Sequence, residues 1–387
     1  MNLSNKNLAE ESFTNSFKSA LVPFLLSRLL LILVFLFGTS FILLEHQDDS
    51  VLRPQVRISN LTKTISNLDK NIIVGDAGWY LGIIKRGYST ETEITDVQRN
   101  WAFFPLFPAT WKLTAKISGE YVYSGLFLSN IFLFFSLALL HRLLRHSELS
   151  PEIARLSLWL LCFFPTSYFL SLPLTESLFL FLVVCSALLV RTGQPFFAAI
   201  VFALATGTRP TGLLMAPAFL FYLFQNGYKP IQSMLLSVTI APLGIVLYSA
   251  YLYSLTGNPL AWMEIQKAWR PGGFPDIDLA NPILLTDWNF VSLNIIAGLL
   301  SLAAGLAFLK NRNLAAALLV TIPVAASLWT GSTLSLARHA LNLFPIFPLL
   351  AAISVGRNLE RVLLTIFSVG LGIMTLLFSL KATSALT

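Results

Sequence analysis

The chain has few of the side chains that carry redox or metal chemistry. Its 387 residues include only two cysteines and four histidines, and just 12% of them are charged. Cys162 and Cys185 lie inside apolar runs, where a thiol behaves as a small buried hydrophobe. Zinc-ligand spacings, glycine-rich phosphate loops and fixed-period repeats are also missing from the sequence. These absences argue against a redox pair, a structural zinc site and a repeat architecture.

Apolar side chains, in contrast, make up 55% of the residues. That fraction, combined with so little charge, is typical of a polytopic membrane protein and not of a soluble domain. The formal net charge of +7 does not form a basic face, because Lys and Arg are scattered at the ends of apolar segments. Membrane topology therefore explains the basic residues better than a nucleic-acid partner does.

Apolar segments of about 20 residues, the length that crosses a bilayer as a helix, recur along the chain. The clear ones are 20–44, 121–141, 231–254, 290–309, 314–330, 338–355 and 362–380. The run 156–190 is too long for one helix, and we expect it to break near Ser171. The run 196–224 has Gly207, Arg209 and Pro210 at its centre, which leaves two short halves. The sequence predicts one all-α membrane domain, 1–387, with about eleven spans.

Short basic loops set the direction of these spans. If 196–224 turns back on itself, all of these loops fall on the side of the N-terminus, as the positive-inside rule requires. They carry Arg142, Arg145, Arg191, Lys229, Lys310, Arg312, Arg357 and Arg361. We therefore expect a cytoplasmic N-terminus and two long outer segments, 45–120 and 255–288. The many aromatic residues of 45–120 predict helices that lie at the membrane interface.

Two carboxylates fall on the outer side in this topology. Asp76 begins an amphipathic pattern, where it is either an ordinary N-cap or a carboxylate kept at the water-facing edge for function. Glu176 begins a predicted span directly after the hydroxyl-rich stretch 165–175. The helix dipole alone favours a carboxylate there, but a charge beside many hydroxyls more often lines a polar cavity. Both are candidates for catalysis.

Two arginines fall on the same side. Arg209 lies between two half-length apolar runs, and Arg338 opens a later span after a polar turn. Either side chain could simply snorkel to the interface. Two outward arginines against the positive-inside trend nevertheless favour an anionic ligand, most simply a phosphate, which arginine binds through paired donors.

Aromatic residues and one histidine are secondary candidates for substrate binding. A lone histidine at a helix start is more often a satisfied polar residue than an acid or base. The tryptophans fit interface anchoring as well as they fit stacking on a sugar. The candidates of this group are Trp79, Tyr80, Trp262, Trp269 and His339.

Several of these motifs together resemble a known family, that of the second GPI mannosyltransferase (PIG-V) and its bacterial relatives. The resemblance runs roughly over 27–350 and follows the family's order of motifs. It rests on 76–88, 104–108, 165–176, 208–210 and Arg338 with Phe344-Pro345. One departure is Gly75, because family members commonly have Trp directly before the acidic residue.

The resemblance implies a GT-C glycosyltransferase with inverting chemistry. It implies a polyprenyl-phosphate sugar as donor and a lipid or glycan acceptor, with a mannosyl group as the simplest transferred sugar. It implies that Asp76 is the base and that Arg338, with Arg209, holds the leaving phosphate. Glu176 would then orient the acceptor or Asp76.

The same resemblance suggests the compartment and the cofactor requirement. A bacterial relative would lie in the inner membrane, with its site on the periplasmic face. No cofactor and no metal is expected, since paired-carboxylate motifs are lacking, although Asp48 and Asp49 leave metal dependence open.

A transporter or lipid flippase is the main alternative, because broken helices and buried charges also mark transport sites. Such a protein should place polar groups near the middle of the membrane and show two related halves. In this chain the candidate residues gather at one face, and the halves show no similarity.

Overall fold

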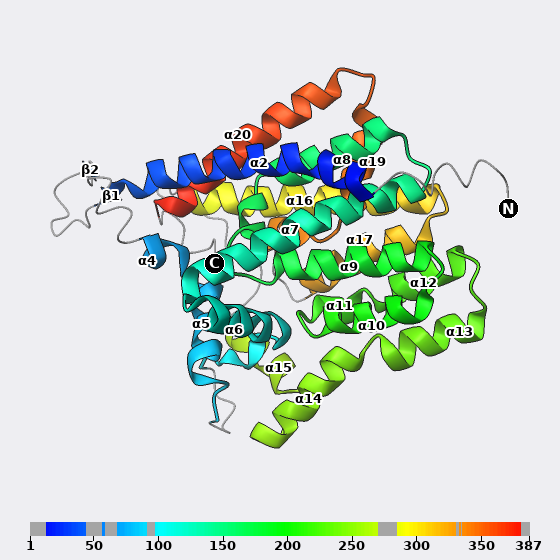
Figure 1. Ribbon diagram of the computed structural model, residues 1–387, viewed down its shortest axis with the longest axis horizontal. Coiled ribbons are helices and arrows are strands. Elements are labelled where there is room, and N and C mark those ends of the chain that lie inside the picture. Colours follow the sequence, from blue (N-terminus) through cyan, green and yellow to red (C-terminus); the bar gives the residue numbers. More distant parts are fainter. Residues whose placement is uncertain are drawn as a thin grey trace.

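The computed structural model is a bundle whose long helices run along the longest axis of the molecule (Figure 1). The structure describes residues 13–43, 56–58, 68–90, 97–269, 285–329, 333 and 335–380. Within these ranges, the side chains of 41–43, 56–58, 269 and 285–291 are not described.

The first part of the chain is one long apolar helix followed by a strand pair and short helices. α2 is apolar on nearly all sides, as expected of a membrane span. The strands β1 and β2, which the sequence does not predict, pair antiparallel with Ile42 opposite Arg57. The elements are α2 (Phe13–Thr39), β1 (Phe41–Leu43), β2 (Val56–Ile58), α4 (Leu68–Ile72), α5 (Asp76–Arg86), η1 (Asn100–Ala102), α6 (Leu106–Ser118) and α7 (Tyr121–His146).

The middle of the chain contains both predicted helix breaks. The long run 156–190 is interrupted between Phe163 and Glu176, which confirms the break near Ser171. The run 196–224 is interrupted after Thr206, at the glycine, arginine and proline that the sequence places there. The elements are α8 (Pro151–Phe163), η2 (Ser167–Leu170), α9 (Glu176–Arg191), α10 (Pro195–Thr206), α11 (Thr211–Leu214) and α12 (Ala216–Gln225).

The last part of the chain differs from expectation at one place. The segment 338–355, expected as one span, is divided into α18 and α19, and Pro345 is the N-cap of the second helix. The elements are α13 (Pro230–Leu235), a π-helical turn η3 (Leu236–Ile240), α14 (Leu243–Thr256), α15 (Ala261–Glu264), η4 (Ile265–Trp269), α16 (Leu285–Lys310), α17 (Leu314–Trp329), α18 (Leu336–Ala340), α19 (Ile346–Ser354) and α20 (Leu359–Ser379).

Among the described residues, five helical segments are long and apolar enough to cross a membrane. They are Phe13–Thr39, Tyr121–His146, Pro230–Thr256, Ser292–Lys310 and Leu359–Ser379. Helices also occupy the other predicted span positions, but they are shorter, from the 9 residues of α19 to the 16 of α9 and α17. The chain is therefore a multi-pass membrane protein, and eleven crossings stay a prediction.

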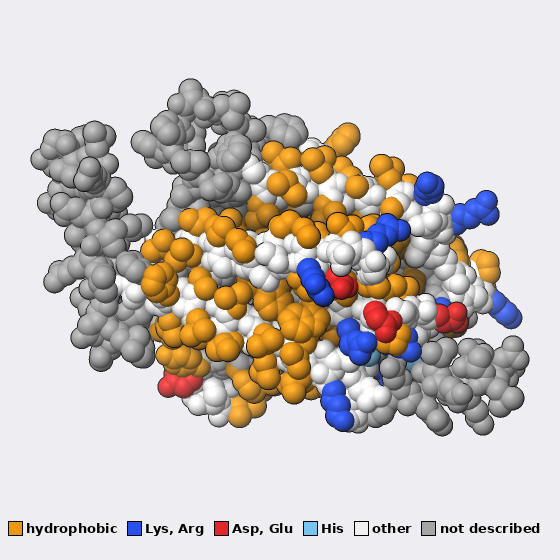
Figure 2. Space-filling model, turned by 90° about the horizontal axis from the view of Figure 1, so that it is seen from above, with side chains coloured by type: hydrophobic (Ala, Val, Ile, Leu, Met, Phe, Trp, Pro, Cys, Tyr) orange, Lys and Arg blue, Asp and Glu red, His pale blue; other side chains and the backbone are white. Residues whose placement is uncertain are grey.

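The surface agrees with a membrane setting. Large apolar side chains are exposed on several of the long helices, among them Leu33, Phe127, Leu299 and Ile366. On the face shown in Figure 2, hydrophobic side chains cover the middle of the long axis, and basic side chains gather toward one end. Such a band without charges suits contact with lipid, and charged ends suit contact with headgroups and water.

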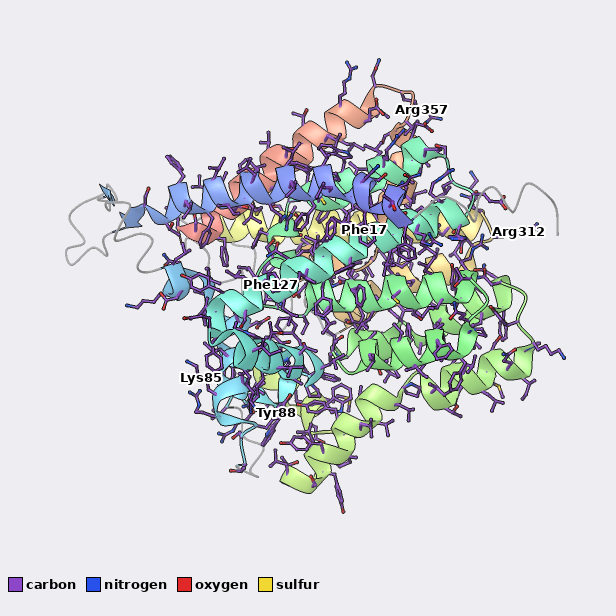
Figure 3. All side chains as sticks on the ribbon, in the orientation of Figure 1. Phe17, Lys85, Tyr88, Phe127, Arg312 and Arg357 are labelled. Carbon is purple, nitrogen blue, oxygen red and sulfur yellow. The ribbon has the colours of Figure 1, made fainter. Side chains whose placement is uncertain are left out.

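The two ends of the bundle differ in the loops they carry. Arg312 and Arg357, from two of the predicted cytoplasmic loops, lie toward one end, and Lys85 and Tyr88 of the predicted outer segment lie toward the other (Figure 3). The grouping agrees with the positive-inside pattern that the sequence predicts.

The core of the bundle is formed where α9 packs against α7 and α10. Nearly every residue of the interrupted segment and the first turns of α9 is buried. α7 approaches this segment closely at Gly125, where a Cβ atom would lie 2.5 Å from the Trp111 ring and 2.8 Å from Pro173. Only glycine permits that approach, so the break between α8 and α9 is set into well-packed protein.

Candidate active site

Four charged side chains from four separate segments meet in one network. The Arg338 guanidinium donates from Nε to Glu176 Oε1 over 2.5 Å and from Nη1 to Asp76 Oδ2 over 2.6 Å. Arg209 Nη1 donates to the same Glu176 oxygen over 2.6 Å. The structure thus joins the two predicted carboxylates and the two predicted arginines, which we call the charge cluster.

The members of the charge cluster differ in how far they reach solvent. The side chain of Asp76 is 22% exposed, that of Arg209 12%, that of Arg338 6% and that of Glu176 0%. Asp76 is therefore the carboxylate that an incoming molecule can reach. Glu176 lies beneath, where one of its oxygens accepts from both arginines and the other, Oε2, has no partner within the described residues.

The backbone before Asp76 explains one departure from the family pattern. Gly75 is the N-cap of α5 and has φ of 52°, in the left-handed region that favours glycine. Asp76 is the first residue of the helix and makes no side-chain capping bond, so it is not the ordinary N-cap that the sequence allowed. A tryptophan at position 75 would strain this turn.

α5 is held in place by aromatic packing on its inner side. The ring of Tyr80 meets Phe103 and Phe107 edge to face, with centroids 5.0 and 5.6 Å apart. Burial, assisted by the negative charge of Asp76, raises the pKa of Tyr80, so its hydroxyl stays protonated. Trp79 stacks on the ring of Phe103, with centroids 5.8 Å apart. Of these predicted substrate residues, Trp79 is half-buried and Tyr80 is buried.

Arg338 is held by contacts from two further segments, α16 and the break between α8 and α9. Its own helix α18 begins after Ser335, a residue with φ of 64°, and is anchored at Ala337. The Ala337 N–H donates to Asn294 Oδ1 over 2.8 Å, and its carbonyl accepts from Thr166 Oγ1 over 2.9 Å. The guanidinium lies over the ring of Phe169 at 4.8 Å, a cation–π contact.

An open groove lies along α5 and reaches the residue directly before Asp76. Its volume is about 320 Å³, and it is lined by Gly75, Gly78, Trp79, Gly82, Arg86 and Asn100. A Cβ atom on Gly78 would meet nothing within 4 Å, so packing does not require glycine there. The missing side chains leave the backbone of α5 accessible next to the exposed carboxylate.

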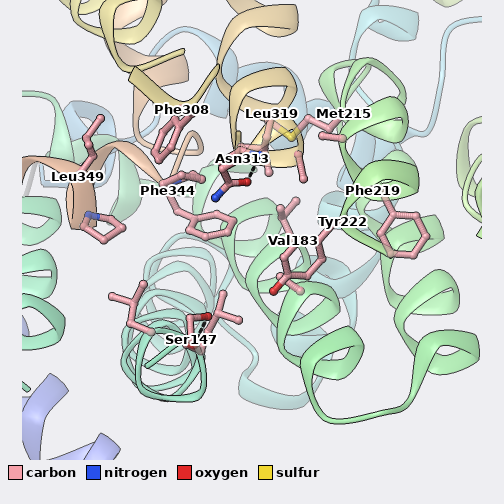
Figure 4. A pocket seen from close by; sticks show the side chains of 18 of the residues that line it. Ser147, Val183, Met215, Phe219, Tyr222, Phe308, Asn313, Leu319, Phe344 and Leu349 are labelled. Atoms are coloured by element: carbon pink, nitrogen blue, oxygen red, sulfur yellow. Dashed lines mark hydrogen bonds between the residues drawn. The ribbon is translucent and has the colours of Figure 1, made fainter. Parts of the chain in front are cut away.

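A second cavity, of about 350 Å³, has a different character (Figure 4). It is lined by apolar side chains such as Val183, Phe202, Phe219 and Phe344, and none of its lining residues is charged. Val183 lies seven residues after Glu176 on α9, about 10 Å along the helix at the usual rise. This cavity therefore does not contain the charge cluster.

The remaining predicted residues are not joined to the charge cluster by any described contact. Trp262 donates from Nε1 to Ser249 Oγ over 3.0 Å and packs edge to face on Phe104. His339 follows Arg338 in α18 and is half-buried. The side chain of Trp269 lies outside the described part of the chain, as do Asp48 and Asp49. Within the described residues, no group of three or more His, Cys, Asp or Glu side chains lies together.

Sequence reasoning missed the residues that support the charge cluster. Asn294 and Thr166 are polar residues inside apolar runs, and neither attracts notice in a chain with many such residues. Arg28 left a clearer signal, because a cation near the middle of a 27-residue apolar helix is costly and marks a site that needs it. Arg28 is 6% exposed and contacts the segment that leads to Glu176.

The geometry suits reactions at an anionic group. The charge cluster is formally neutral, with two positive and two negative side chains. Among the described residues, Nη2 of Arg338 and Nη2 of Arg209 have no hydrogen-bond partner, so both guanidiniums keep donors for another acceptor. A multi-pass membrane protein with paired arginines that can bind an anion is the class of protein that this fold and site define.

The family comparison gives that class a name. The family model described as Mannosyltransferase (PIG-V) matches residues 18–259, and the chain belongs to this family. Membership of this family supports a membrane glycosyltransferase, and transport, the alternative function, is not favoured. The matched region contains Asp76, Glu176 and Arg209, whereas Arg338 lies beyond its end.

Two relatives show the same similarity at modest identity. GPI alpha-1,6-mannosyltransferase 2 of Cricetulus griseus is 27% identical over 267 residues, which cover 59% of this chain and 52% of the relative. The protein of the same name from Mus musculus is 26% identical over the same shares. The chain thus spans about half the length of the curated relatives it matches. No solved structure matches it.

Proposed function

We propose that the protein transfers a mannosyl group from a polyprenyl-phosphate donor to a hydroxyl group of a lipid or glycan acceptor, with inversion. The family supports the transferred sugar, and the charge cluster supports the chemistry. The observation that carries the proposal is the pairing of Arg338 with Asp76 at 2.6 Å, which places a cation beside the more exposed carboxylate of the charge cluster. Base and phosphate clamp are then neighbours, as direct displacement requires.

In the proposed step, Asp76 takes the proton of the acceptor hydroxyl as that oxygen bonds to the anomeric carbon. The bond from the anomeric carbon to the phosphate oxygen breaks, and its electron pair leaves with the lipid phosphate. Arg338 and Arg209 stabilise the charge that grows on this leaving group through their spare N–H donors. Because a phosphate is a good leaving group, the step needs no separate acid.

The charges balance through this step. The donor is a phosphodiester with one negative charge, and the leaving phosphate monoester carries up to two. Protonation of Asp76 removes one negative charge from the formally neutral cluster at the same moment. The cluster therefore becomes cationic as the phosphate becomes dianionic, and the sum of charges at the site does not change.

The groove on α5 is the proposed acceptor site. It lies next to Asp76 and offers the Trp79 indole, the Arg86 guanidinium and the Asn100 amide. A sugar ring could lie flat on the glycine backbone and stack against the indole, a contact typical of carbohydrate sites. Metal-independent transfer, the inner membrane of a bacterium and the periplasmic face complete the proposal.

The experiment compares three purified proteins in lipid nanodiscs: the wild type, Asp76→Asn and Asp69→Asn. Each is incubated with radiolabelled polyprenyl-phosphate mannose and a lipid extract of the host, with and without EDTA. Asp69 is an exposed carboxylate of the neighbouring helix α4, so its variant is the matched control. We expect transfer by the wild type and the control, and a kcat lower by roughly 10²- to 10⁴-fold for Asp76→Asn.

Two results would contradict the proposal. Wild-type turnover by Asp76→Asn would remove the base, although the transferase itself would stand. Absence of transfer with mannose, glucose and arabinose donors alike, by protein shown to be folded, would remove the proposed donor class. Loss of activity in EDTA, restored by a divalent cation, would overturn metal independence alone.

A further inference from the structure

We propose that Arg28 is a positioning residue of the transfer reaction. It holds the buried segment 164–175, and this segment in turn sets the places of Glu176 and Arg338. The inference rests on the proposed function for its chemistry, but its structural part can be tested without any turnover.

All five N–H donors of Arg28 are used within the protein. Nη1 donates to the Ser167 carbonyl over 3.1 Å and to Ser171 Oγ over 2.7 Å. Nη2 donates to the Cys162 carbonyl over 3.1 Å and to Ser167 Oγ over 2.7 Å. Nε donates to Ser27 Oγ over 3.3 Å. Four of the five bonds thus tie α2 to the break between α8 and α9.

This bonding pattern excludes two other roles. A guanidinium with every donor engaged and 6% exposure has nothing left with which to bind a substrate. Among the described residues no carboxylate pairs with it, so it is not half of a buried ion pair. Burial of a cation without a carboxylate partner costs free energy. The fold retains Arg28 where its guanidinium satisfies the carbonyls and hydroxyls of one segment.

The break between α8 and α9 explains why an arginine is needed. α8 ends at Phe163, so its last carbonyls, including that of Cys162, lose their helical partners and form the negative end of the helix dipole. Irregular backbone inside a membrane protein is tolerated only where such groups are satisfied. A planar fork of five donors fits this role, and a lysine with three donors does not.

A chain of contacts leads from Arg28 to the charge cluster. Ser171, one of its acceptors, donates to Asn130 Oδ1 of α7 over 2.9 Å, which fixes the far end of the segment. The hydroxyl of Ser177, next to Glu176, donates to the Leu170 carbonyl. Phe169 directly precedes Leu170, and its ring lies under the Arg338 guanidinium at 4.8 Å. Arg28 and Arg338 therefore both contact the same short segment.

The test uses the full-length protein in nanodiscs with Arg28→Lys and with Ser16→Ala as matched control. Ser16 is also a buried residue of α2, and its hydroxyl lies 3.2 Å from His141 Nδ1 of α7, away from the interrupted segment. Loss of this bond weakens helix packing without touching 164–175. For each variant we would measure the melting temperature, kcat, the donor KM and the hydrogen exchange of backbone amides in 164–178.

For Arg28→Lys we expect kcat lower by roughly 10- to 100-fold, since a shift of about 1 Å at reacting groups has that effect. We expect a smaller rise in the donor KM and faster exchange in 164–178 than elsewhere in the bundle. Ser16→Ala should keep kcat within about twofold even where it lowers the melting temperature as much. In a Glu176→Asp background the effect of Arg28→Lys on kcat should largely disappear, because both changes act on one carboxylate.

Other outcomes separate the two proposals. If kcat falls only in proportion to the melting temperature, and equally in Ser16→Ala, Arg28 is a packing residue and the inference fails. If exchange in 164–178 is unchanged, or if Arg28→Lys and Glu176→Asp are additive, it fails as well, whatever the activity. If the wild type transfers no sugar while exchange responds as expected, the structural role of Arg28 stands and the proposed function fails.

Discussion

Two buried arginines that contact the segment 164–175 differ in what they bind. Arg28 uses all five donors on neutral oxygens. Arg338 binds two carboxylates, and within the described residues its Nη2 makes no hydrogen bond. All donors of Arg28 are satisfied without a ligand, whereas Arg338 lies in an ion-paired cluster and can still donate to an anion. The difference separates a structural cation from a binding cation more clearly than burial does, since both are about 5% exposed.

The largest stability effect among the predictions in this comparison should come from Glu176→Gln. The change leaves Arg209 without its carboxylate and Arg338 with Asp76 alone, and loss of one partner from a buried pair costs about 3–5 kcal/mol. We expect a clear fall in melting temperature in detergent, together with weak donor binding. Asp76→Asn is the control, because its 22% exposed side chain should contribute far less to stability.

Equal melting temperatures for Glu176→Gln and the wild type would show that Glu176 does not anchor the arginines. The charge cluster would then be a network that does not depend on a buried carboxylate. Its arginines would no longer differ from Arg28 in how they are bound.

The second prediction concerns the substitution Arg338→Lys. Lysine keeps the charge but cannot contact Asp76, Glu176 and a phosphate with fixed forked donors. We expect a rise in the donor KM and a fall in kcat, with kcat/KM for the donor lower by roughly 10²-fold. Initial rates over a range of donor concentrations measure both, and the acceptor KM is the internal control because it should change little.

The effects of Arg28→Lys and Arg338→Lys on kcat and the donor KM should differ. By the positioning argument, Arg28→Lys should lower kcat more than it raises the donor KM, whereas Arg338→Lys should change both. The same pattern of KM and kcat in the two variants would mean that one mechanism, general loosening of the bundle, explains both arginines.

Much of the fold was predictable because helix breaks are local. The interruptions can be predicted from the sequence itself, because one apolar run contains Pro165 and Pro173 and another contains Gly207 and Pro210. The break at Pro345 was missed, although a proline well inside the expected span 338–355 disfavours an uninterrupted helix. The strand pair was missed because three-residue strands leave too short an alternation to detect.

The charge cluster was predictable for a different reason. Charges are so rare in this chain that those at the ends of apolar runs could be assigned to one face by topology alone. The partners of Arg338 were not predictable, because they depend on three-dimensional packing between segments more than a hundred residues apart. Arg28 was overlooked because its acceptors are backbone carbonyls and serine hydroxyls, which are common along the chain and form no motif.

The smallest effect is expected from Arg209→Lys. Arg209 makes one described hydrogen bond, to Glu176, and its side chain is 12% exposed, twice the exposure of Arg338. Lysine can keep one charge-assisted bond to that carboxylate, so only the second donor toward the phosphate is lost. One hydrogen bond of roughly 1 kcal/mol corresponds to about a fivefold lower kcat/KM for the donor. An effect as large as that of Arg338→Lys would show that the phosphate lies between the two arginines and not over Arg338. The binding cation to compare with Arg28 would then be the pair of arginines and not Arg338 alone.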